Sequence, residues 1–342
     1  MPREKIGLGI IGLGIVYRFG HAQAYRKITD KTKVVAVCDV DGLLAEEESK
    51  RFDAKSYTDY QDLLNDPEVK AVDIILPHHL HYPVAKYALE NGKHVLIEKP
   101  MTVTPDESME LIELAKKDRV ILALCENTRF VKAYIEVKKL LDEGVIGEPR
   151  LVRTLISGSE VHRLRNTFLW KGKKGGSGGG TIIDAGAHSF FLLKWLFGEI
   201  ESLQTLDAKL IEQSEVEDWA IVAGQLKCGA LFSTEYTFTS EGPWNERLEI
   251  HGDKGLIVVD QLLDPPARRY KSGNDYVGTP ITSVPYEPYR WKSISIAAGI
   301  KDFIEAIWED KPPAIDLMDG YYAVKVIESA YKSLREGKAV FL

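Results

Sequence analysis

The sequence predicts two domains: an α/β domain with a doubly wound parallel sheet, then an α+β domain with a large, mostly antiparallel sheet. In residues 1–125, short β-branched runs alternate with helical patterns, which is typical of parallel strands covered by helices. After Asn127, strand patterns follow one another directly. The 342 residues are 44% hydrophobic, enough for two cores. We therefore expect domains at 1–126 and 127–342.

The elements expected in the first domain follow from its apolar periodicity. Strands are expected at 6–11, 33–38, 71–76, 94–97 and 120–124. Helices, with apolar residues three to four positions apart, are expected at 16–27, 42–52, 82–91 and 106–117. Each strand is thus followed by a helix that returns the chain to the start of the next strand.

The second domain is expected to begin with a helix and to end with two helices. The first helix spans 131–143, and the last two span 294–308 and 320–335. Between them, strands are expected at 151–157, 200–210, 220–226, 230–238, 246–251 and 255–260. Segment 261–291 is rich in Pro, Gly and Tyr and reads as a long loop.

Composition and charge exclude several classes of protein. There are 44 Lys and Arg against 51 Asp and Glu, a net charge of −7, so we expect no nucleic-acid partner. Cys38, Cys125 and Cys228 lack the spacing of a zinc or disulfide framework, which favours a cytoplasmic protein. The apolar run 6–16 is interrupted by glycines and resembles a buried strand more than a secretory signal, and no membrane span is expected.

A glycine-rich turn after the first strand suggests a phosphate-binding loop, because free backbone N–H groups at a helix start attract anions. Two registers are possible. Gly7-x-Gly9-x-x-Gly12 matches the dinucleotide fingerprint but lies inside the strand, whereas Gly12-x-Gly14-x-x-Tyr17 lies at its end with tyrosine as the third residue. We take the second register. A tight strand-to-helix turn without a ligand is the alternative.

The expected cofactor contacts extend from this loop. The expected contacts are Gly12 and Gly14 of the loop, together with Ile15 and Val16 at the start of the helix. Asp39 follows the second strand, where a carboxylate can accept both hydroxyls of the adenosine ribose and repel a 2′-phosphate. Asp39 therefore favours NAD, with NADP the less favoured cofactor, unless it is only a turn aspartate.

Glu98 and Lys99 directly follow a buried strand, at the carboxyl edge where open α/β sheets bind ligands. Pro100 restricts the backbone conformation of this short loop, so the Lys99 side chain can be held in one direction. A solvated salt bridge is the alternative, more plausible for Glu98 than for Lys99.

Asp184 and His188 are four residues apart in an apolar helical stretch that follows the glycine-rich run 178–180. This spacing places both side chains on one face of a helix. Polar groups in such a stretch point into a satisfied polar pocket or an active site, and we favour the active site.

The sequence resembles the Gfo/Idh/MocA oxidoreductases, which include glucose-fructose oxidoreductase and inositol dehydrogenase, over the whole chain. The motifs that carry the resemblance are Gly12-Leu13-Gly14, 77–81, 88–100, Asn127-x-Arg129-Phe130, Gly144-x-Ile146-Gly147 and Gly179-Gly180-x-x-x-Asp184-x-Gly186-x-His188. The resemblance implies an N-terminal Rossmann domain and an NAD cofactor. It also implies that Lys99, Asp184 and His188 form the catalytic group, and that the nicotinamide side is lined by Pro77, His81, Glu98 and Asn127. His78 and Lys99 are further expected cofactor contacts.

Three residues depart from the family pattern: Tyr17 replaces a small residue, His78 stands where Asn is frequent, and Phe191 stands where many members have Asp. These departures leave the predicted fold unchanged, but they make the identity of the substrate harder to predict. His78, His79 and His81 could together suggest a metal, but no carboxylate or cysteine accompanies them locally, so we expect none.

The expected function is NAD-dependent oxidation of a secondary alcohol on a sugar or cyclic polyol, with His188 as the base and Lys99 beside it. The alternatives are a nucleotide-sugar or sugar-acid dehydrogenase of the same family, and a non-catalytic sugar- or nucleotide-binding regulatory protein. Substrate contacts are expected from Lys99, Arg163, Trp170, Asp184 and His188, and from aromatic residues including Trp244, Tyr270, Tyr276, Tyr286, Tyr289 and Trp291. The resemblance also implies that sheets of two subunits pack together, in a homodimer or homotetramer.

Overall fold

The computed structural model describes residues 4–271, 273, 275–281, 283–285 and 290–342. It divides into two compact units, Met1–Asn127 with Lys292–Tyr321, and Thr128–Trp291 with Tyr322–Leu342. The division departs from the expected linear order because helix α11 (Trp291–Glu309) contributes core residues to the first unit. Ile300 and Phe303 of this helix pack in one apolar cluster with Leu8 and Tyr17.

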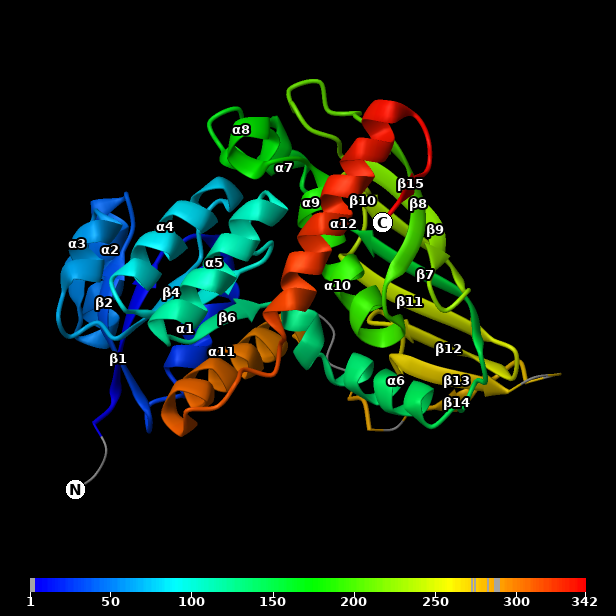
Figure 1. The fold of residues 1–342 in the computed structure, drawn as a ribbon, viewed down its shortest axis with the longest axis horizontal. Helices are drawn as coiled ribbons and strands as arrows, with labels where there is room; N and C mark the ends of the chain where they lie inside the picture. Colours follow the sequence, from blue (N-terminus) through cyan, green and yellow to red (C-terminus); the bar gives the residue numbers. More distant parts are fainter. Residues whose placement is uncertain (1–3, 272, 274, 282, 286–289) are drawn as a thin grey trace. The chain divides into compact units, whose positions relative to one another are not determined.

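The first unit contains a six-stranded sheet in the order β3-β2-β1-β4-β5-β6, and all its neighbouring strands are parallel (Figure 1). The strands are β1 (Ile6–Ile11), β2 (Thr32–Cys38), β3 (Lys55–Tyr57), β4 (Ala71–Ile74), β5 (His94–Glu98) and β6 (Leu122–Cys125). The expected doubly wound sheet is thus confirmed. Strand β3 was not expected, because it is a short edge strand of three residues without an apolar run.

The helices of this unit follow the strands. They are a π-helical turn η1 (Tyr17–His21), α1 (Ala22–Tyr25), α2 (Gly42–Phe52), α3 (Tyr60–Asn65), α4 (His78–Glu90) and α5 (Pro105–Asp118). Side chains of Asp41 and Thr104 accept backbone N–H bonds at the starts of α2 and α5. Helix α4 begins four residues earlier than the expected position 82, since Pro83 is accommodated inside the helix.

The second unit contains a nine-stranded sheet in the order β14-β13-β12-β11-β7-β10-β9-β8-β15. Among the described strands of this second sheet, only β7 and β10 pair in parallel, which confirms the mostly antiparallel sheet. The strands are β7 (Pro149–Ser157), β8 (Ile200–Ala208), β9 (Trp219–Leu226), β10 (Leu231–Thr237), β11 (Asn245–Gly252), β12 (Gly255–Asp260), β13 (Ala267–Lys271), β14 (Thr279–Pro280) and β15 (Val340–Phe341).

The long loop expected at 261–291 is wrong in part, because β13 and β14 lie within it and extend the sheet. Strand β14 is a two-residue edge strand and β13 lies next to it, and both have few apolar residues, so their pattern resembles a loop.

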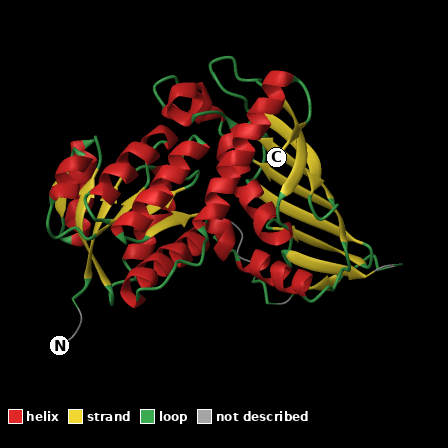
Figure 2. Ribbon diagram, viewed as in Figure 1, coloured by secondary structure: helices red, strands yellow, loops and turns green. Residues whose placement is uncertain are grey.

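Helices cover one face of this sheet, and no described helix covers the other (Figure 2). The helices of this unit are α6 (Lys132–Asp142), α7 (Val161–Arg165), η3 (Trp170–Gly172), α8 (Lys174–Ser177), α9 (Thr181–Asp184), α10 (Gly186–Phe197) and α12 (Leu317–Glu336), and among them α9 and α10 contact β10. Alternate residues of the strands, such as Phe232 and Tyr236 of β10, are buried on the covered side.

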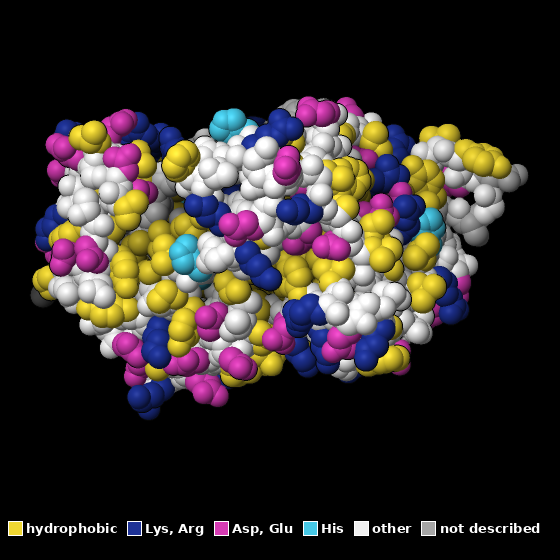
Figure 3. Space-filling model, turned by 90° about the horizontal axis from the view of Figure 1, so that it is seen from above, with side chains coloured by type: hydrophobic (Ala, Val, Ile, Leu, Met, Phe, Trp, Pro, Cys, Tyr) yellow, Lys and Arg dark blue, Asp and Glu magenta, His cyan; other side chains and the backbone are white. Residues whose placement is uncertain are grey.

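The surface seen in Figure 3 carries acidic and basic side chains interspersed with one another. This mixture agrees with the modest net charge of −7. Among the described residues, no helix has the combination of length and apolar character that a membrane span requires.

Candidate active site

The glycine loop begins where β1 ends. Gly7 and Gly9 lie within β1, so the register Gly12-x-Gly14 is the one at the strand end. Gly12 has a φ of +96°, and a Cβ there would collide with the carbonyl oxygen of Ile75. Gly14 is exposed, and a Cβ added there would meet no atom within 4 Å, so its backbone is open to a phosphate group.

Tyr17 has a local explanation. The chain after the loop forms a π-helical turn, and Tyr17 is buried in it with only 1% of its surface exposed. Its hydroxyl donates to Glu48 Oε1 of α2 at 2.6 Å. Burial, reinforced by this carboxylate, raises the pKa of Tyr17. The tyrosine therefore ties the loop helix to α2 in place of the close packing that a small residue would give.

Asp39 lies directly after β2 and is half-buried. Its carboxylate accepts from the backbone N–H of Leu13 at 2.8 Å and from that of Asp41 at 3.0 Å. The first bond joins Asp39 to the glycine loop. A carboxylate fixed at this position keeps further lone pairs for hydroxyl donors, which fits the ribose of a dinucleotide.

The remaining expected cofactor residues of this unit follow β4, β5 and β6 at the carboxyl edge of the same sheet. Pro77 precedes α4 and Asn127 follows β6, where its amide donates to Ser295 Oγ at 3.0 Å. Glu98 ends β5, and Lys99 comes next. The sheet thus brings the loop, Asp39 and these residues to one edge, which is where doubly wound sheets bind dinucleotides.

Helix α4 contains two buried histidines, His78 and His81. The ring nitrogens of His81 lie 2.7 Å from the carbonyl oxygen of Pro100 and 2.8 Å from that of Leu76. Burial lowers the pKa of His81, although these carbonyls oppose the shift. His78 is buried edge-on against the His81 ring. His81 therefore joins the chain after β4 to the chain after Lys99.

In the second unit, the glycine run before Asp184 is enclosed by other side chains. A Cβ at Gly179 would collide with the Tyr331 hydroxyl, and one at Gly180 with the backbone of Glu217. The Glu217 carboxylate accepts from the N–H of Gly180 and of Ile182, both at 3.0 Å, and from Tyr331 Oη at 2.8 Å. Burial raises the pKa of Glu217 in spite of these donors. This network fixes the start of α9.

Asp184 ends α9 and His188 lies in the first turn of α10, with Ala185 between the two helices. His188 is 7% exposed, and the Asp184 side chain is 15% exposed. His188 borders a small pocket whose other walls come from α6, β7 and β11. Phe191, one of the departures from the family pattern, is buried in the core.

Lys171 was not expected at the site. Its ammonium lies 2.7 Å from Asp184 Oδ2 and 3.4 Å from Glu160 Oε2, and 4.8 Å from the centre of the Phe238 ring. Burial lowers the pKa of Lys171 by more than the two carboxylates raise it. Lys171 lies in the short helix η3, and nothing in the sequence around it indicates that its side chain is buried.

The expected substrate residues have varied positions. Arg163 pairs with Glu160 at 2.9 Å, and Trp170 begins η3. Trp244 stacks on Phe238, and Trp291 lies edge-on to Tyr134, so these two tryptophans serve packing. Tyr270 is partly buried in β13 and Tyr276 is 86% exposed. Tyr286 and Tyr289 lie outside the described residues.

Comparison with known proteins covers both halves of the chain. Residues 6–125 match the family model described as an oxidoreductase family, NAD-binding Rossmann fold, and 138–342 match its C-terminal alpha/beta domain. The myo-inositol 2-dehydrogenase of Thermotoga maritima is 27% identical over 98% of each chain. The levoglucosan dehydrogenase of Pseudarthrobacter phenanthrenivorans is 25% identical over 96% of this chain and 97% of that one.

Solved structures show the same fold. The WlbA dehydrogenase of Bordetella pertussis, in complex with NADH and UDP-GlcNAcA, superimposes with a TM-score of 0.86 at 22% identity over 99% of each chain. The glycine loop, Asp39 and the sheet edge described above fit the NAD of such a Rossmann fold. Because the models for both of its domains match, the protein belongs to the Gfo/Idh/MocA family of NAD-binding oxidoreductases.

Proposed function

We propose that this protein oxidises a secondary alcohol of a neutral sugar or cyclic polyol with NAD. The observation that carries the proposal is the pair Asp184 and His188, one helical turn apart in an apolar stretch, in a chain whose first unit binds NAD. The names of the Thermotoga and Pseudarthrobacter relatives support this substrate class.

In the proposed reaction, NAD supplies the acceptor for the hydride that leaves the substrate carbon. His188 takes the hydroxyl proton, because a neutral imidazole has a ring nitrogen that can accept one. The Lys99 ammonium stabilises the negative charge that develops on the substrate oxygen. Asp184, held by Lys171, orients either His188 or a second substrate hydroxyl.

A neutral substrate is favoured by the charges around Asp184. Arg163 pairs with Glu160, and Lys171 pairs with both Glu160 and Asp184, so each cation already has a carboxylate partner. A carboxylated or phosphorylated sugar would have to compete with these carboxylates. A nucleotide-sugar is the second candidate substrate, because the Bordetella structure contains UDP-GlcNAcA.

A substrate panel tests the proposal. Purified protein with NAD is mixed with neutral aldoses, inositols, sugar acids, sugar phosphates and nucleotide-sugars, and NADH absorbance is followed. Oxidation of a neutral aldose or inositol supports the proposal. Activity confined to the charged sugars contradicts it, and binding of NAD and sugar without turnover indicates the regulatory alternative.

We also propose Asp39 as the reason for NAD over NADP, and a homodimer or homotetramer as the assembly. The uncovered face of the second sheet supports the assembly, because it exposes Leu206, Trp219, Ile221 and Leu231 on neighbouring strands.

A further inference from the structure

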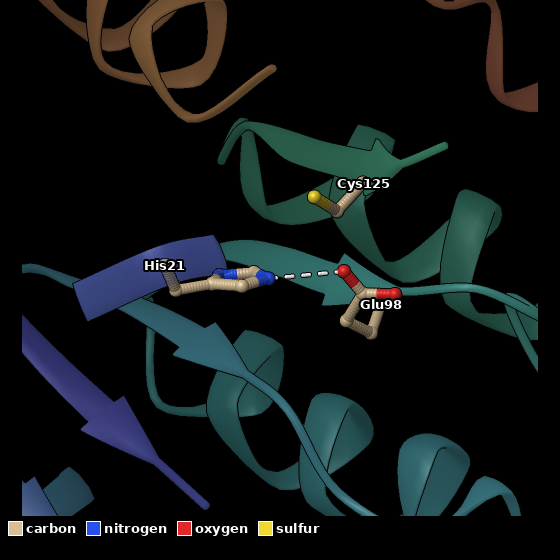
Figure 4. Close-up of side chains that lie close together, drawn as sticks. All are labelled: His21, Glu98 and Cys125. Carbon is tan, nitrogen blue, oxygen red and sulfur yellow. Dashed lines mark hydrogen bonds and ion pairs between the residues drawn. The ribbon is translucent and has the colours of Figure 1, made fainter. Parts of the chain in front are cut away.

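The first unit contains a buried group of ionisable side chains beneath the carboxyl ends of β4, β5 and β6. His21 is fully buried, with Nδ1 2.6 Å from Asp73 Oδ2 and Nε2 3.0 Å from Glu98 Oε1. Figure 4 shows the His21 ring directed at Glu98, with Cys125 on the neighbouring strand. The Tyr25 hydroxyl donates to the same oxygen of Asp73 at 2.6 Å.

The geometry determines the charge of His21. Both ring nitrogens face carboxylate oxygens, so a neutral ring would turn one lone pair toward a negative charge. Burial alone lowers the pKa of His21, but Asp73 and Glu98 outweigh it and raise the pKa well above its usual range. The interaction with His21 also outweighs burial at Glu98 and lowers its pKa to about 2. The group is therefore an imidazolium between two carboxylates.

A metal ion is a weaker explanation for this group. The ligand atoms of His21, Glu98 and Cys125 lie within 4.8 Å of one another. A metal needs a free imidazole lone pair and a thiolate. Here both ring nitrogens are engaged by carboxylates, and burial raises the pKa of the Cys125 thiol.

Strand order indicates which part of NAD lies near Glu98. The glycine loop follows β1 and Asp39 follows β2, so the pyrophosphate and the adenosine ribose occupy that side. The nicotinamide then lies toward β4 and β5, on the other side of β1. Glu98 is the last residue of β5, and its second oxygen accepts from the Lys99 N–H at 3.1 Å.

We propose that His21 is a positioning residue that keeps Glu98 ionised and fixed at the sheet edge, where its charge favours the oxidised cofactor over the reduced one. The nicotinamide ring is positively charged in NAD⁺ and neutral in NADH, so a fixed carboxylate stabilises only the former. The other groups that act on this pair are Asp73 and Tyr25, the Cys125 thiol, and the cations of Lys99 and Lys292. The proposal rests on the NAD site, not on the proposed sugar.

The test compares dissociation constants of NAD⁺ and NADH, titrated separately without substrate. For Glu98→Gln, we expect the ratio of the NAD⁺ constant to the NADH constant to rise roughly tenfold. Tyr25→Phe is the matched control, because it removes a hydrogen bond of the same network but no charge, and its ratio should stay unchanged. The proposal is overturned if the ratio in Glu98→Gln equals that of the wild type, including the case in which the variant binds NAD⁺ and NADH more weakly by the same factor.

The role of His21 has its own readout. In the wild type the ratio should be constant from about pH 5 to 8, because Glu98 stays ionised throughout. In His21→Gln, the buried carboxylate loses its cation, so the ratio should become pH-dependent within that range. A pH-dependent ratio in the wild type, or a constant ratio in a folded His21→Gln protein, contradicts the proposal. The dissociation constants of NAD⁺ and NADH are measured without substrate, so they do not depend on whether any sugar reacts. The proposed function can therefore be wrong while this proposal is right.

Discussion

The Lys171 ammonium lies 2.7 Å from Asp184 Oδ2 and is buried among carboxylates and the Phe238 ring. This contact determines what Asp184 can do. A carboxylate paired with a buried lysine ammonium is held in one orientation, in which it can accept hydrogen bonds. Lys171 thus acts through Asp184.

Replacing Lys171 should therefore reduce turnover without weakening NAD binding. For Lys171→Met we expect kcat to fall roughly tenfold or more, and its pH profile to shift as Asp184 loses its cation. Lys171→Arg should recover part of the loss, and Lys173→Met, at an exposed neighbour, should have no effect. The measurement is the pH profile of kcat, obtained from steady-state kinetics over a pH series. An unchanged profile in Lys171→Met would show that Lys171 has a purely structural role.

The proposed base and alkoxide partner should both be essential. His188→Asn and Lys99→Ala should each lower turnover by roughly a hundredfold or more, because each removes a group that acts on the reacting hydroxyl. Dissociation constants for NAD, measured by titration, should change little in His188→Asn. Near-normal turnover in either variant would refute its assignment.

The elements of the first unit could be predicted because each apolar run specifies a local structure. Strand β1 and helix α2 begin and end where the apolar periodicity places them. Strands β3, β13 and β14 were not predicted, because they are short strands at or next to a sheet edge that bury few side chains and carry little apolar signal.

The partners of the site residues could not be predicted, since they come from distant parts of the chain. His21 meets Asp73 and Glu98 across 52 and 77 positions, and Glu217 meets Gly180 across 37. Periodicity places a side chain on a face of its own element but says nothing of which residue lies opposite.

Cofactor selectivity should depend on Asp39. Asp39→Ala should narrow the difference between the dissociation constants of NAD and NADP, because the carboxylate no longer repels a 2′-phosphate. Asp41→Asn is the control, since Asn also caps the helix start where Asp41 accepts from Leu43 and Leu44. If the wild type bound NADP more tightly than NAD, this prediction would be wrong.

Acid should weaken the first unit through Glu98. Its pKa is lowered to about 2 in the folded protein, so the unfolded chain binds more protons as the pH falls. The stabilisation is present above the ordinary pKa of a glutamate and is lost as the pH falls toward about 2, a change of a few kcal/mol. Urea unfolding at about pH 5 and pH 3 should show this loss in the wild type and a smaller loss in Glu98→Gln. Equal losses in both would contradict the assignment.

Assembly should depend on the uncovered face of the second sheet. Ile221 is 46% exposed and pairs with Leu206, which is 66% exposed on the adjacent strand. Apolar side chains side by side on an open face lose water when a second sheet packs on them, so Ile221→Glu should weaken association by burying an unpaired charge. Light scattering at micromolar protein should give a dimer or tetramer for the wild type and smaller particles for Ile221→Glu. Leu43→Glu, at an 81% exposed position of α2 in the first unit, is the control and should assemble normally. A monomeric wild type, or an Ile221→Glu protein that assembles as the wild type does, would exclude this face as the subunit interface.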